Sequence, residues 1–114
     1  MYLSTQEELK AYCDEASTCR VVAVDTEFLR EKTFFPRLCL IQVNAGGSIA
    51  AIDPILIEDL SPLAAIFEDP DVVKVFHACS QDLEVLWDGM GCVCRNVFDT
   101  QVAAAFLGLR QQIG

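Results

Sequence analysis

The chain has 114 residues, of which 53% are hydrophobic and 22% are charged. This length suits one compact domain and leaves no room for two, and the hydrophobic content excludes a disordered chain. No apolar run approaches the roughly 18 residues that a membrane span needs, and the acidic, polar N-terminus is unlike a signal peptide. Six cysteines without such a signal indicate reduced thiols and a cytoplasmic protein.

The charge balance argues against simple electrostatic binding to nucleic acid. Eight Lys and Arg residues stand against 17 Asp and Glu, which gives a formal net charge of −9. Nucleic-acid-binding modules are usually basic, because neutralising phosphates supplies most of their affinity. An acidic protein that acts on a polyanion therefore needs a bridge between the two, and divalent metal ions provide one.

The first half of the chain predicts one helix and three strands. Ser4 or Thr5 caps the helix, because Glu stands three residues after each of them, and the helix is expected to run to about Ser17. The predicted strands cover residues 20–28, 37–44 and 49–53, with a hairpin turn at 45–48. We expect these strands to be antiparallel, with the charged, aromatic residues 29–36 forming a loop.

The second half predicts three helices and one more strand. A helix is expected over residues 55–67, with Ser61 and Pro62 as its cap and first-turn pair, and a strand over 72–77. A helix at 80–90 ends at Gly91, and Asp99 caps a last helix at 100–109. This order of elements predicts an α/β layered domain with a mixed sheet.

The sharpest chemical feature is the pair Asp25 and Glu27 at the end of an apolar strand. Residues two apart on a strand point to the same face, so the two carboxylates lie side by side and repel each other. A cation relieves this repulsion, and oxygen donors suit Mg²⁺ or Mn²⁺ rather than zinc. The alternative is a strand end with two ordinary surface acids.

Asp82 is the third candidate, in the first turn of the helix that follows the strand ending at His77. A first-turn Asp is also the usual complement of a helix dipole. His77 at a strand end is more often structural than a ligand, and Asp99 is interpreted as an N-cap.

Four runs of sequence favour the functional interpretation of these acids. Residues 24–42, VDTEFLREKTFFPRLCLIQ, strongly resemble the first exonuclease motif of the ribonuclease D family. Residues 77–86, HACSQDLEVL, resemble its second motif, and residues 52–54 (IDP) and 98–105 (FDTQVAAA) continue the match. The resemblance covers nearly the whole chain.

The resemblance implies a ribonuclease H-like fold: three antiparallel strands followed by a parallel strand, with helices on both faces. It also implies 3′→5′ exonucleolytic cleavage with two divalent metal ions, Mg²⁺ or Mn²⁺. Asp25, Glu27 and Asp82 match the first three of the family's four acidic ligands. The implied substrate is an RNA 3′ end, with transfer RNA precursors as the family expectation and single-stranded DNA as an alternative.

One family motif has no counterpart. A Tyr shortly before a last Asp is missing, since the only tyrosines are Tyr2 and Tyr12. We therefore expect residues 1–114 to form a single, truncated exonuclease domain with a weakened metal site. Apolar surface left uncovered predicts a homo-oligomer. The alternative function is a non-catalytic remnant that only binds RNA or a partner.

The loop after the acidic pair combines basic and aromatic side chains, which hold phosphates and stack on unpaired bases. An ordinary loop packed on the core is equally compatible with this pattern. A zinc module is a third alternative, although its cysteine spacing is poor. The nucleic-acid candidates are Phe28, Arg30, Lys32, Phe35 and His77, and the zinc candidates are His77, Cys79, Cys92 and Cys94.

Overall fold

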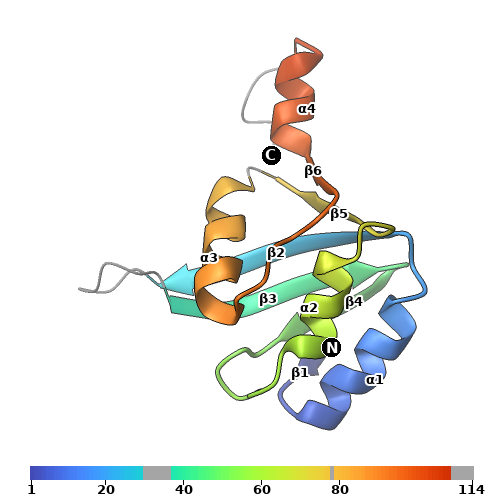
Figure 1. Ribbon diagram of the computed structural model, residues 1–114, viewed down its shortest axis with the longest axis vertical. Coiled ribbons are helices and arrows are strands. Elements are labelled where there is room, and N and C mark those ends of the chain that lie inside the picture. The colour runs from blue at the N-terminus through green and yellow to red at the C-terminus, as the bar shows by residue number, and fades with distance from the viewer. Residues whose placement is uncertain (30–36, 78, 109–114) are drawn as a thin grey trace.

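The computed structural model describes residues 1–29, 37–77 and 79–108. Six strands form one sheet in the order β1-β4-β3-β2-β5-β6 (Figure 1). The strands are β1 (Tyr2–Leu3), β2 (Val21–Leu29), β3 (Arg37–Ala45), β4 (Ser48–Ile52), β5 (Val73–Phe76) and β6 (Val97–Asp99). The helices are α1 (Gln6–Ala16), α2 (Ser61–Glu68), α3 (Ser80–Met90) and α4 (Thr100–Phe106).

The predicted mixed sheet is confirmed. Strands β2, β3 and β4 are antiparallel, and β5 pairs with β2 in parallel. Two short strands were not predicted: β1 pairs in parallel with β4, and β6 pairs in parallel with β5. Both lie at the edges of the sheet, where two or three residues are too few to show a strand period.

Helix ends follow local hydrogen bonds. Thr5 caps α1 through a capping box with Glu8, and Gly91 ends α3 in the left-handed conformation, as predicted. The helix predicted from residue 55 begins only at Ser61. The reason is that Oδ1 of Asp53 accepts the amides of Ile55 and Leu56, which holds this stretch in a turn instead of a helix.

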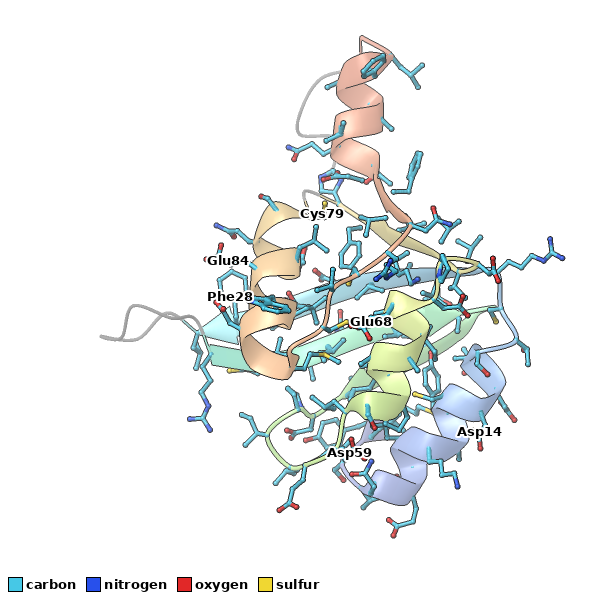
Figure 2. The ribbon with its side chains drawn as sticks, in the orientation of Figure 1. Asp14, Phe28, Asp59, Glu68, Cys79 and Glu84 are labelled. Carbon is cyan, nitrogen blue, oxygen red and sulfur yellow. The ribbon has the colours of Figure 1, made fainter. Side chains whose placement is uncertain are left out.

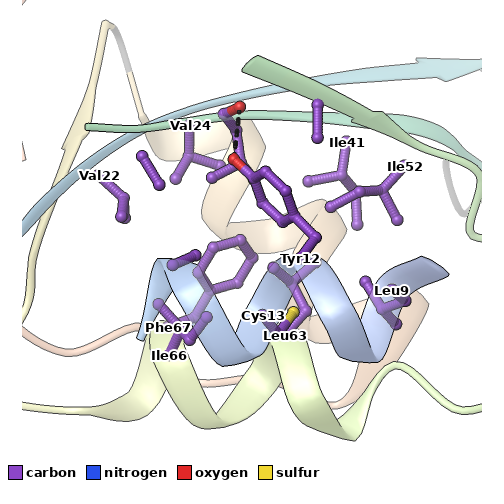
Figure 3. Packing of buried hydrophobic residues seen from close by; sticks show 14 of the residues in the cluster. Leu9, Tyr12, Cys13, Val22, Val24, Ile41, Ile52, Leu63, Ile66 and Phe67 are labelled. Atoms are coloured by element: carbon purple, nitrogen blue, oxygen red, sulfur yellow. Dashed lines mark hydrogen bonds between the residues drawn. The ribbon is translucent and has the colours of Figure 1, made fainter. Parts of the chain in front are cut away.

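Helices α1 and α2 pack together against the sheet (Figure 3). Val22 and Val24 on β2 are buried beneath them, and Tyr12 crosses the layer from α1. The Tyr12 hydroxyl lies 2.7 Å from the carbonyl oxygen of Ser48 and 3.2 Å from that of Val43. The hydroxyl therefore fastens α1 to the β3–β4 hairpin from inside the core.

A β-bulge brings α3 close to β3. Glu27 pairs with Leu40 and Phe28 with Leu38, so Cys39 is an extra residue on β3. The bulge leaves Leu38 on the buried face, where it meets Gly89 of α3. A Cβ atom on Gly89 would lie 3.0 Å from Cβ of Leu38.

The opposite face of the sheet is open in the part of the chain that the structure describes. Along β2, Val21, Ala23, Asp25 and Glu27 are exposed and alternate with buried neighbours. We expected helices on both faces, but α1, α2 and α3 share one face and α4 extends beyond the β6 edge (Figure 1). None of the described helices combines the length and apolar character needed to span a bilayer.

Candidate active site

Asp25 and Glu27 lie on β2 beyond the end of β5. Pairing between β2 and β5 stops at Ala23, so none of the described strands covers this edge of β2 next to the two acids. Both side chains are exposed and share the open face, as the strand period predicts. Their exposure alone is also compatible with the alternative of two surface acids at a strand end.

Asp82 reaches this edge from the first turn of α3 and is only 7% exposed. The backbone amide of Thr26 donates to Oδ1 of Asp82 at 3.2 Å and to Oδ1 of Asp25 at 3.0 Å. The Thr26 hydroxyl also donates to Oδ1 of Asp82. This amide is free to serve both carboxylates because β5 ends before it.

The converging carboxylates concentrate negative charge at this edge of β2. Burial raises the pKa of Asp82, and the charges of Asp25 and Asp99 raise it further, while the hydrogen bonds from Thr26 act in the opposite direction. A buried carboxylate beside other carboxylates favours protonation or a bound cation. The electrostatics therefore suit a cation at this edge.

The donor set fits a hard divalent cation, because all three groups offer carboxylate oxygens. Among the described residues, however, no group of three or more His, Cys, Asp or Glu side chains is arranged to hold a metal ion. Asp25 and Asp82 converge on Thr26, and Glu27 is placed beside them on the open face. The arrangement is a partial site.

The zinc alternative is not supported. His77 and Cys79 precede α3 whereas Cys92 and Cys94 follow it. Eleven helical residues separate the two pairs by about 16 Å along the helix axis. No single ion could contact all four residues.

His77 and Phe28 flank the site from different elements. His77 is exposed, and its Nδ1 lies 2.8 Å from the hydroxyl oxygen of Thr100 at the start of α4. Phe28 is partly buried against the core, on the face opposite to Asp25 and Glu27, and lies near α3 (Figure 2). The other nucleic-acid candidates, Arg30, Lys32 and Phe35, lie outside the described residues.

Two residues near the site were missed by the sequence analysis or understood only in part. Thr26 was passed over as the residue between two acids, although it joins Asp25 and Asp82. Asp99 caps α4, as predicted, and its Oδ2 also accepts the amide of Cys79 at 2.8 Å, which ties α4 to the start of α3. No local pattern signals either contact.

A family model described as a 3′-5′ exonuclease matches residues 1–114. The chain belongs to this 3′-5′ exonuclease family. Ribonuclease D of Acidiphilium cryptum is 47% identical over 113 residues, which cover 98% of this chain and 29% of the relative. Ribonuclease D of Escherichia coli is 42% identical over 106 residues, which cover 93% of this chain and 28% of the relative. The chain thus spans less than a third of these relatives.

Solved structures give the same family assignment. The crystal structure of Escherichia coli RNase D, an exoribonuclease involved in structured RNA processing, has a TM-score of 0.94 and 40% identity, covering 100% of this exonuclease chain and 30% of that one. Brucella melitensis NrnC with bound Mg²⁺ has a TM-score of 0.75 and 28% identity, covering 87% and 52%. The resemblance to ribonuclease D and its ribonuclease H-like fold is confirmed.

Proposed function

We propose that this chain is a metal-dependent 3′-5′ exoribonuclease domain that removes nucleotides from RNA 3′ ends in the cytoplasm. The main observation that supports this proposal is the shared amide of Thr26, which brings the carboxylates of Asp25 and Asp82 together at the open edge of β2. Membership of the 3′-5′ exonuclease family supports the direction of cleavage. Residues 1–114 would belong to a single exonuclease domain.

Asp25, Glu27 and Asp82 would hold two divalent ions, Mg²⁺ or Mn²⁺. Bound metal ions of this kind activate a water molecule and stabilise the leaving 3′ oxygen during phosphodiester hydrolysis. The related NrnC structure contains Mg²⁺, which supports this choice of metal. Thr26 acts as a positioning residue, since its donors hold Oδ1 of Asp82 and leave Oδ2 for a ligand.

The substrate would be a structured RNA with an accessible 3′ end, such as a transfer RNA precursor. The Escherichia coli relative, described as acting in structured RNA processing, supports this class. Phe28 and His77 would contact the terminal nucleotide, while Arg30, Lys32 and Phe35 would bind phosphates and bases farther along the strand. Single-stranded DNA is the competing substrate.

The test is the shortening of a 5′-labelled RNA in the presence of Mn²⁺. Stepwise shortening is expected, and Asp25→Asn should abolish it, whereas Asp88→Asn, an exposed charge change on α3, should not. Equal shortening of RNA and single-stranded DNA would contradict the substrate class. RNA binding without shortening would favour the non-catalytic alternative, for which the incomplete metal-binding group is the supporting observation.

Self-association is a separate proposal. On α4 and at its end, Val102, Phe106 and Leu107 are 60%, 92% and 78% exposed. Apolar side chains exposed together favour association. We expect a homo-oligomer in sedimentation velocity, and a monomer at all concentrations would contradict this expectation.

A further inference from the structure

Two cysteines lie side by side in the segment after α3. Cys92 and Cys94 flank Val93, whose side chain is 52% exposed, while Cys92 is 2% exposed and Cys94 is partly buried. Both cysteines line the same hollow, and neither is in a disulfide. The pair therefore consists of two free thiols, one buried and one partly exposed, two residues apart.

The backbone around the dithiol is held at three points. The amide of Cys92 donates to Leu86 at 3.3 Å, that of Arg95 donates to Phe67 at 2.9 Å, and that of Val93 donates to the Glu68 side chain at 3.1 Å. These contacts fasten the segment to α3 and α2. These anchors therefore hold both cysteines in one short, fixed segment.

Small molecules can reach the pair. Cys92 and Cys94 line a hollow of about 260 Å³ together with Leu83, Trp87 and Val93. The hollow opens to the surface beside Trp87, which is 56% exposed and is the single tryptophan of the chain. A low-molecular-weight disulfide can therefore approach Cys94, and Trp87 reports on the site.

The two thiols differ in exposure and in pKa, and the charge of a buried cation, Lys74, acts to lower the pKa of both. Lys74 has no exposed surface, and its Nζ donates to the carbonyl oxygens of Asp69 at 2.5 Å and Arg95 at 3.0 Å. Interaction with the neighbouring Cys92 thiol lowers the pKa of Cys94, and the charge of Lys74 lowers it further. The same interaction, together with burial, raises the pKa of Cys92. Because Cys94 is also the more exposed of the two, it is the attacking thiolate and Cys92 its proton-bearing partner.

We propose that Cys92 and Cys94 form a reversible disulfide by exchange with oxidised glutathione. The Cys94 thiolate attacks one glutathione sulfur, forms a mixed disulfide and releases a glutathione thiolate. The Cys92 thiol then passes its proton to that thiolate and attacks the Cys94 sulfur, which releases the second glutathione. Two protein thiols are oxidised and one glutathione disulfide is reduced to two thiols.

The spacing of the cysteines explains why the bond would be reversible. Residues two apart in an extended chain have Cα atoms up to about 7 Å apart, at the upper limit of about 6.8 Å for a disulfide. A disulfide between residues two apart therefore forms only when the segment is short of full extension, close to the limit of what the bond geometry allows. Strained disulfides are readily reduced, which suits a redox-sensitive modification rather than a structural cross-link.

The test uses the reduced wild-type protein treated with oxidised glutathione. We expect intact mass to fall by two hydrogen atoms, peptide mapping to join Cys92 to Cys94, and Trp87 fluorescence to decrease because a nearby disulfide quenches indole. Dithiothreitol should reverse all three changes. A disulfide that maps to any other pair, or glutathione adducts without an internal bond, would overturn the proposal.

Single substitutions distinguish the attacking cysteine, Cys94, from the cysteine that closes the disulfide, Cys92. Cys92→Ser should trap glutathione on Cys94, and Cys94→Ser should abolish both the adduct and the internal bond. Cys19→Ser, at another partly buried cysteine, should leave the Cys92–Cys94 bond unchanged. Equal glutathione addition to Cys92 and Cys94 in the two variants would contradict the assigned order of attack.

Discussion

Asp25 and Asp82 accept hydrogen bonds from the same backbone amide, that of Thr26. The two carboxylates come from positions 57 residues apart in the chain, and one N–H group holds both at the edge of β2. The Thr26 hydroxyl adds a second bond to Asp82. The geometry of the candidate site therefore depends on a residue that has no charge.

Removing the Thr26 hydroxyl should destabilise the fold and the site together. In Thr26→Val, the partly desolvated carboxylate of Asp82 loses a donor, which costs about 1–2 kcal/mol of unfolding free energy. Thr26→Ser keeps the hydroxyl and should lose much less. Urea denaturation followed by circular dichroism compares them, and equal losses in the two variants would show that this hydrogen bond contributes nothing.

Asp82→Asn should change how stability depends on pH. Burial raises the pKa of Asp82 in the folded state, so folding favours the protonated carboxyl group. The folded protein therefore loses stability as the pH rises from the unfolded-state pKa of Asp82 through its folded-state pKa. Asparagine stays neutral and escapes this loss. The unfolding free energy of the variant relative to wild type should therefore increase from about pH 4 upward and then level off.

Urea titrations between pH 3 and pH 8 in the presence of a chelator measure this difference. The chelator removes divalent ions that would otherwise stabilise the wild-type carboxylate. A difference between the two proteins that stays constant over this range would contradict a raised pKa.

Divalent metal should stabilise the folded protein through the acidic site. A ligand that binds only the folded state at one hundred times its dissociation constant adds about 2.7 kcal/mol. Mn²⁺ should therefore raise the thermal midpoint of the wild type and of Asp88→Asn, but not that of Asp25→Asn. Calorimetry checks this expectation, and equal shifts in both variants would place the bound metal elsewhere.

Gly89→Ala should destabilise the protein even though alanine is the better helix former. The added methyl group would lie 3.0 Å from Cβ of Leu38, which belongs to a strand and has little room to move. Overpacking costs about 1–3 kcal/mol, while the gain in helix propensity is about 1 kcal/mol. Urea denaturation should show a net loss, with exposed Asp88→Ala as the control, and a net gain would refute close packing of α3 on β3.

Strong local signals explain most of what could be predicted about the fold. Helix α3 matches its predicted range because apolar spacing and Gly91 define both its length and its end. Helix α2 starts six residues later than predicted. The reason is that Asp53 accepts hydrogen bonds from the amides of Ile55 and Leu56, two residues that hydropathy alone assigns to a helix. Prediction of a helix boundary from sequence therefore fails where short-range hydrogen bonds compete with helix formation.

The candidate site was predictable only in part for a different reason. The strand period places Asp25 and Glu27 on one face, and the structure agrees. The contact of Asp82 with Thr26 joins two elements far apart in the chain, and no local pattern carries that information. Asp82 was a candidate from its place in the first turn of a helix, and the family resemblance added weight to it. Its metal-binding role stays a prediction.

The bulge at Cys39 also has a consequence for variation in chain length. Residues of β3 pair regularly with β2 before and after Cys39, but Cys39 itself has no pairing partner on β2. Deleting Cys39 would turn the bulge into a regular ladder and leave Leu38 opposite Phe28. Deleting a paired residue such as Gln42 would exchange the inner and outer faces of every residue on one side of the cut. Within this hairpin, Cys39 is therefore a position where relatives can differ by one residue without rebuilding the core.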